Sequence, residues 1–211
     1  VYVAWKRAFK SGGIDNSALP TASINPLSPT FAGFDALIYE SEEAEGFEIG
    51  VKSNLLDNSL RINATYYFYE YTDLQVQLFD ASIIQFSTFN AGAVETEGFE
   101  ADMLWYTDVE GLTLRGQFAW TDATNTGDFF NTSGVNLRGS ERSYSPEFAG
   151  SFGFSYDAGL GAGWRVNLSS DARYSDDYGW GVYKNSPRQD SFWMNDAAIS
   201  IYSDDGKHSI N

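Results

Sequence analysis

Apolar and polar residues alternate with a period of two along most of this chain. From Leu60 to Tyr69, every even position holds an apolar or aromatic residue, while the odd positions hold arginine, asparagine, threonine and two tyrosines. Because successive side chains of a β-strand point to opposite faces, this pattern predicts strands with one apolar and one polar face. The apolar faces must meet either in a soluble core or against lipid, and that choice decides what the chain can do.

The alternating stretches predict an all-β fold of about nine long strands. Most of the stretches exceed ten residues, whereas the strands of soluble proteins usually have about 5–6. A strand that crosses a membrane at a tilt needs about 9–11 residues, so the lengths favour part of a larger transmembrane β-barrel. The predicted strands cover residues 1–9, 38–53, 59–77, 90–107, 111–124, 146–157, 163–176, 190–203 and 207–211.

Short and long connections alternate between these predicted strands. The short ones are rich in glycine, aspartate or asparagine, as tight hairpins require. This rhythm predicts an antiparallel up-and-down meander with all long loops at one end, as in outer-membrane barrels. A soluble β-sandwich would mix loop lengths and use Greek-key crossings. The short connections are 54–58, 108–111, 158–163 and 203–206, and the long ones are 10–37, 78–89, 125–145 and 177–189.

Aromatic residues lie at both ends of the predicted apolar face, which suits the two interfaces of a membrane. Trp164 and Tyr174 are ten residues apart on one face. At ~3.3 Å per residue and a ~40° tilt, they span ~25 Å along the membrane normal, about the height of the apolar band of a barrel. We therefore expect the apolar face to meet lipid and the polar face to line a wet or plugged lumen. The lumen-facing candidates are Glu48, Arg61, Glu100 and Arg115.

The role of those four charged residues has two possible interpretations. Neighbouring lumen charges of opposite sign can satisfy one another as partly buried pairs, which is the reading we favour. They can also contact a plug or a substrate.

The charge and the cysteine count exclude several classes of function. With 29 acidic and 13 basic residues, the chain has a formal net charge of −16, which argues against nucleic-acid binding. It contains no cysteine, and therefore no disulfide framework or thiol chemistry. No apolar run approaches the ~18 residues of a transmembrane helix.

No catalytic, metal or cofactor site emerges from the residue pattern, so an enzyme is not expected. His208 is the only histidine, too little for a transition-metal site or a hydrolase triad. The run from Gly159 to Gly163 lacks the ending of a phosphate-binding loop and reads as a turn. The acidic residues Glu40, Glu42, Glu43 and Glu45 could bridge cations or lipopolysaccharide, but they read better as a solvated strand extension.

Two of the long loops combine aromatic residues with arginines. These side chains suit a siderophore, a glycan or an aromatic metabolite. They equally suit packing of the loops over a barrel mouth. The ligand-binding candidates are Phe129, Phe130, Arg138 and Arg142 in the loop at 125–145, and Tyr178, Trp180, Tyr183 and Arg188 in the loop at 177–189.

Several short motifs occur in an order and at spacings that resemble those of TonB-dependent receptors. The most specific lie between residues 45 and 100, although the resemblance covers nearly the whole chain. Ala8 departs from the glycine that the family often has in its first motif. The motifs are Ala8-Phe9-Lys10-Ser11-Gly12-Gly13, Glu45-Gly46-Phe47-Glu48-Ile49-Gly50-Val51-Lys52, Asn63-Ala64 with Tyr71-Thr72-Asp73-Leu74-Gln75, Asn90-Ala91-Gly92-Ala93 with Gly98-Phe99-Glu100, and Ser145-Pro146-Glu147.

The resemblance implies a 22-stranded barrel in the cell outer membrane, filled by an N-terminal plug and coupled through a TonB box to active import of a scarce ligand. Residues 1–211 would then be a partial barrel domain from its later half, without plug, TonB box or last strands. Nine strands cannot close such a barrel. The implied partners are outer-membrane lipid and lipopolysaccharide, the protein's own plug, TonB and a small-molecule ligand.

Two other functions stay open at this point. A passive outer-membrane porin or a barrel adhesin would share the faces and the loop rhythm but would lack the plug and the TonB box. A soluble carbohydrate-binding β-sandwich would have shorter strands whose apolar faces meet in a core. The ligand is open between a siderophore, a glycan and another nutrient.

Overall fold

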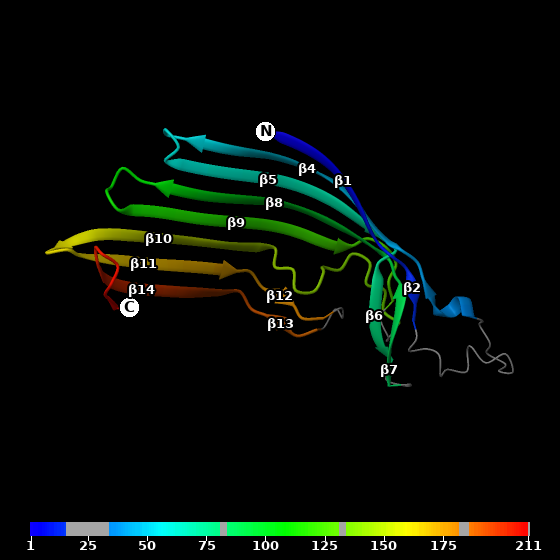
Figure 1. Ribbon diagram of the computed structural model, residues 1–211. Helices are drawn as coiled ribbons and strands as arrows, with labels where there is room; N and C mark the ends of the chain where they lie inside the picture. Colours follow the sequence, from blue (N-terminus) through cyan, green and yellow to red (C-terminus); the bar gives the residue numbers. More distant parts are fainter. Residues whose placement is uncertain (16–33, 81–83, 131–133, 182–185, 211) are drawn as a thin grey trace.

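The computed structural model describes residues 1–15, 34–80, 84–130, 134–181 and 186–210. Nine strands form one antiparallel sheet in which sequence neighbours pair with each other. Figure 1 shows the strands side by side in a curved sheet, with the short turns at one end and the long connections at the other. The strands are β1 (Tyr2–Lys10), β4 (Glu42–Leu55), β5 (Leu60–Thr72), β8 (Ala93–Tyr106), β9 (Leu112–Asn125), β10 (Phe148–Gly161), β11 (Trp164–Ser175), β14 (Phe192–Ser203) and β15 (Ser209–Ile210).

This architecture confirms the prediction of an all-β, up-and-down meander of nine strands. Seven of the nine strands have 12–14 residues, which is longer than usual in soluble domains. Among the described residues, no helix is long and apolar enough to cross a bilayer.

The prediction of one continuous strand over residues 59–77 is wrong. β5 ends at Thr72, and β6 (Gln75–Asp80) pairs with β7 (Gln85–Asn90) in a separate hairpin that turns away from the main sheet (Figure 1). The break occurs at Asp73, whose φ of 52° is left-handed and incompatible with a strand. The side-chain amide of Asn90 donates a hydrogen bond to the backbone oxygen of Asp73 at 2.6 Å and so stabilises the bend.

The connections contain further short elements that the alternation did not predict. β3 (Ile38–Tyr39) pairs with β2 (Gly13–Ile14) instead of extending the main sheet, so the strand predicted from residue 38 begins only at Glu42. A short 3-10 helix, η3 (Phe34–Leu37), precedes β3. In the loop at 177–189, β12 (Tyr178–Gly179) pairs with β13 (Arg188–Gln189).

The strand register joins the apolar residues of successive strands into one continuous face. Tyr66 lies opposite Phe99, Phe99 opposite Trp120, and Trp120 opposite Phe148. Farther along the sheet, Tyr174 lies opposite Trp193, with their ring centroids 5.0 Å apart. The aromatic row therefore begins in the middle of β5 and β8 and approaches the loop end of the sheet from β9 onward.

Nothing in the described part of the chain covers this apolar face. Phe152 is 54% exposed and Ile199 is 62% exposed. Among the described residues, the buried apolar side chains are few: Val94 at the loop end of β8, and Leu37, Phe129 and Leu137 outside the central sheet. A soluble β-sandwich would bury its apolar faces against each other, so this arrangement does not fit that fold.

Candidate functional site

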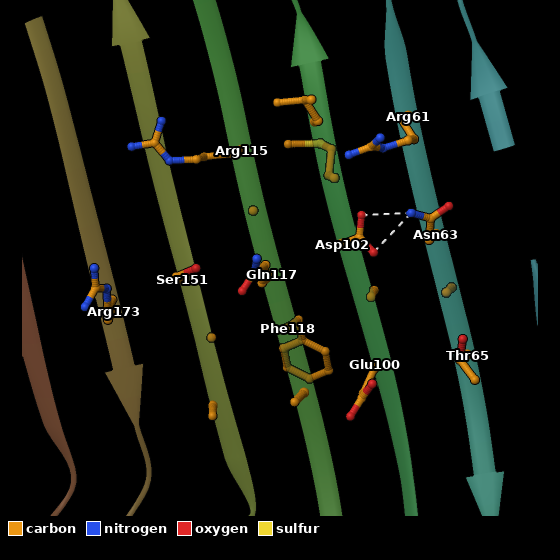
Figure 2. Close-up of a pocket in the computed structure, with 18 of the residues that line it drawn as sticks. Arg61, Asn63, Thr65, Glu100, Asp102, Arg115, Gln117, Phe118, Ser151 and Arg173 are labelled. Carbon is orange, nitrogen blue, oxygen red and sulfur yellow. Dashed lines mark hydrogen bonds between the residues drawn. The ribbon is translucent and has the colours of Figure 1, made fainter. Parts of the chain in front are cut away.

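The face opposite the apolar one carries a row of polar side chains contributed by successive strands. Asn63 lies opposite Asp102, Asp102 opposite Gln117, and Gln117 opposite Ser151. The next strand places Arg173 opposite Ser151. Figure 2 shows these side chains around a hollow of about 790 Å³ that spans β5, β8, β9, β10 and β11. We call this side of the sheet the polar face.

Three of the four residues predicted to face a lumen line this hollow: Arg61, Glu100 and Arg115 (Figure 2). Glu48 lies on the same face, where it accepts hydrogen bonds from Lys6 Nζ at 2.5 Å and from the Tyr69 hydroxyl at 2.7 Å. Their role toward a plug or a substrate stays a prediction.

Charges of opposite sign pair on the polar face, but not all of them. Arg115 pairs with Asp171, and Arg165 pairs with Asp157. Asn63 donates to both carboxylate oxygens of Asp102, at 3.1 and 2.9 Å. Arg61 and Glu100 form no hydrogen bond or ion pair within the described ranges, so their charges face the hollow without a partner there.

A second hollow, of about 360 Å³, lies in the long loops. Main-chain hydrogen bonds place its walls together: the Arg142 amide donates to the Ala123 oxygen at 2.8 Å, and the Tyr144 amide donates to the Gly179 oxygen at 2.9 Å. The first bond ties the loop to β9, and the second ties it to the β12–β13 hairpin. Side chains from two loops far apart in the sequence therefore share one hollow.

Three of the predicted ligand-binding arginines line this hollow, and we call it the arginine pocket. It is lined by Arg138, Arg142, Arg188, Glu141, Ser143, their neighbours in segment 135–143, and Gly179, Gly181 and Ser186. Arg188 donates from Nε to Asp177 at 2.8 Å and from Nη1 to Glu141 at 3.3 Å. These hydrogen bonds, first that to Asp177 and then that to Glu141, raise the pKa of Arg188 above its ordinary value.

The predicted aromatic candidates do not gather in the arginine pocket. Phe129 is 5% exposed and belongs to the packing of the loop, whereas Phe130 and Trp180 are about half exposed, at 56% and 50%. Tyr178 packs its ring against Tyr144, with centroids 6.2 Å apart. Tyr183 lies outside the described residues.

Two residues beside the arginines were not among the sequence candidates. Tyr144 has a left-handed φ of 59°, a strained conformation for a residue other than glycine or asparagine. The hydroxyl oxygen of Ser143 is shielded from solvent and has no hydrogen-bond partner in the described part of the loops. Neither feature leaves a signal in the sequence. In the same described part of the chain, no group of three or more His, Cys, Asp or Glu residues could hold a metal ion.

A curved antiparallel meander with an uncovered apolar face and loops at one end is a segment of a barrel wall. The model of the family "TonB dependent receptor-like, beta-barrel" matches residues 1–205. The chain therefore belongs to this family. A comparison with curated proteins found no match.

Solved receptor structures share the fold. The siderophore receptor PiuA from Acinetobacter baumannii is 21% identical, with a TM-score of 0.62, over 81% of this chain and 23% of its own. The ferric yersiniabactin uptake receptor FyuA from Yersinia pestis is 14% identical, with a TM-score of 0.67, over 95% of this chain and 27% of its own. The pyoverdine outer membrane receptor FpvA from Pseudomonas aeruginosa PAO1 is 16% identical, with a TM-score of 0.58, over 96% and 27%. At these identities the likeness concerns the fold alone, and this chain spans about a quarter of each solved chain.

Proposed function

We propose that this chain forms part of the wall and mouth of an outer-membrane receptor that imports a small-molecule ligand by TonB-dependent transport. The uncovered apolar face of the sheet carries the proposal, because such a face requires lipid or another apolar partner. Membership of the receptor family supports it. So do the functions of its structural neighbours, which include a siderophore receptor, a ferric yersiniabactin uptake receptor and a copper transporter.

Each side of the sheet then has one role in this proposal. The apolar face meets membrane lipid, with its aromatic row at the headgroup level. The polar face lines the lumen, where the unpartnered charges of Arg61 and Glu100 can meet the plug. The loops that hold the arginine pocket stand at the outer mouth, near lipopolysaccharide, and make the first contact with the ligand.

Uptake by the full-length receptor tests this proposal. The gene is expressed in a Gram-negative strain lacking related receptors, and accumulation of radiolabelled iron is measured with a panel of ferric siderophores, with and without TonB. We expect uptake of at least one complex, lost when TonB is deleted. Uptake that continues at the same rate without TonB would instead identify a passive pore.

A further inference from the structure

The arginine pocket contains a guanidinium whose charge has no acidic partner in the described residues. Arg142 is half-buried, and within the described residues its guanidinium makes one hydrogen bond, from Nη1 to the neutral side-chain oxygen of Asn125, at 3.2 Å. A guanidinium has five N–H donors, so most of the hydrogen-bonding capacity of Arg142 is unused. A partly desolvated cation gains most from an anionic acceptor.

A second unsatisfied donor lies beside it. The hydroxyl oxygen of Ser143, the next residue, is shielded from water and lacks a partner among the residues described around the pocket. A buried hydroxyl without a hydrogen bond is unfavourable, and native proteins rarely contain one. Two adjacent residues of one wall of the pocket thus have donors without acceptors.

Arg188 forms the opposite wall and is held in place before any ligand arrives. Its Nε and Nη2 atoms lie 2.8 and 2.7 Å from Asp177 Oδ2, and its Nη1 lies 3.3 Å from Glu141. This arrangement fixes the plane of the guanidinium, while N–H donors on its other edge stay available. A fixed donor costs little conformational entropy when it binds a ligand.

The lining of the pocket is basic although the chain is acidic. Three arginines and one glutamate line it, in a chain whose formal net charge is −16. Arg138 adds a third guanidinium that is only loosely paired, at 3.7 Å from Asp128 Oδ1. Asp177, Glu141 and Asp128 balance the charges of Arg188 and Arg138. The charge of Arg142, which has no acidic partner among the described residues, is therefore the one that favours an anion.

Building on the proposed import function, we propose that the arginine pocket binds oxyanion groups of the imported ligand, with Arg142 as the principal contact. Planar guanidinium forks match the paired oxygens of carboxylates and phosphates. A volume of about 360 Å³ accommodates a small molecule or one arm of a larger one. The ligand class is thus a small acid with several carboxylate or phosphate groups, rather than a neutral glycan.

Calorimetric titration of the full-length receptor in detergent tests this proposal with citrate and pyrophosphate as probes. Triethyl citrate, which has the same skeleton without the charges, is the matched ligand control. We expect both anions to bind, with an affinity that falls as ionic strength rises, and triethyl citrate not to bind. Equal binding of citrate and triethyl citrate would overturn the proposal, as would the absence of binding by either anion.

Two substitutions at Arg142 and one distant control locate the binding. Arg142→Gln should weaken anion binding about tenfold or more, the effect of losing hydrogen bonds from a charged donor. Arg142→Lys keeps the positive charge but loses the paired N–H donors of the guanidinium, and should weaken anion binding less. Lys207→Gln removes an exposed charge at the turn end of the sheet and should leave it unchanged. Circular dichroism checks that each variant is folded. Unchanged binding by folded Arg142→Gln would refute the assignment.

The outcome for the pocket and the outcome for transport can be separated. If iron uptake requires TonB but a folded Arg142→Gln receptor binds anions normally, the pocket assignment fails and the import function stands. If anions bind through Arg142 but uptake does not require TonB, the transport proposal fails and the site stands.

Discussion

Arg115 of β9 and Asp171 of β11 form an ion pair across the intervening strand β10. Arg115 Nε donates to Asp171 Oδ1 at 2.9 Å, although the two residues are not on neighbouring strands. Gly153 of β10 lies between them in the register, opposite Arg115 on one side and Asp171 on the other. A Cβ atom at Gly153 would overlap the Asp171 carboxylate and lie 3.0 Å from Arg115 Nε. The missing side chain is what allows the two charges to meet.

We therefore expect Gly153→Ala to destabilise the protein. The new methyl group would force the ion pair apart and press on the Ser170 backbone oxygen at 2.9 Å, at a cost of about 1–3 kcal/mol. Most of this cost is steric, because the two charged side chains are 41% and 28% exposed and their pairing is weakened by solvent. Unfolding of the full-length receptor in urea measures the change.

Gly159→Ala is the matched control for that substitution. Gly159 lies in the same strand, and a Cβ atom there meets nothing within 4 Å. Its free energy of unfolding should stay close to that of the wild type. If both alanine variants lose the same stability, the close approach at Gly153 is not the cause.

Adjacent residues should report opposite environments on the two faces. Because the chain has no cysteine, single cysteines can be placed at Phe152 on the apolar face and at Ser151 on the polar face. A fluorophore at position 152 should be quenched by brominated lipid, and one at position 151 should not. The fluorescence of each label is measured in the reconstituted full-length receptor, in which any other cysteines have first been replaced. Equal quenching at both positions would show that the apolar face does not meet lipid.

A charge in the middle of the apolar face should be poorly tolerated. Ile199 lies opposite Leu168, midway between the two aromatic ends of β11. Ile199→Arg should therefore cost about 2–4 kcal/mol in folding from denaturant into bilayers. The neighbouring Ala198→Arg places the same charge on the polar face and should cost much less. A similar loss in both variants would contradict the assigned faces.

The turn after β14 should respond to acid through Asp205. Its pKa is lowered by a hydrogen bond from the Ser203 hydroxyl, at 2.6 Å, and then by the backbone amide of Lys207, at 3.1 Å. A lowered folded-state pKa means that the carboxylate stabilises the turn above the unfolded value of ~3.9. This contribution is lost as the pH falls through the folded pKa.

Selective ¹⁵N-lysine labelling with NMR provides the measurement for Asp205. The amide signal of Lys207, assigned with Lys207→Arg, should keep its position from neutral pH down to about pH 4 and shift below it. In Asp205→Asn the signal should lack this acid transition. A transition of the same size in that variant would assign it to another group.

The alternation of residues was sufficient to predict most strands, but not the hairpin β6–β7. The alternation that begins at Leu60 resumes at Leu74 and Val76, and neither glycine nor proline lies between, so the sequence looks like one long strand. The break depends on a left-handed aspartate at Asp73 and on the side chain of Asn90, seventeen residues later. Aspartate tolerates this conformation without requiring it, so contacts between distant residues, such as that with Asn90, settle where the strand stops.

The sequence by itself determined most strands of the main sheet, their two faces, the order of the meander and the end that holds the long loops. These properties follow from local periodicity and turn chemistry, which act between residues close in the chain. Only the tertiary structure brought Arg138 and Arg142 to Arg188, and left Arg142 and Ser143 without acceptors. Composition alone had nominated the three arginines, but their meeting depends on backbone contacts between two loops, such as that of Tyr144 with Gly179. No periodic pattern encodes such contacts.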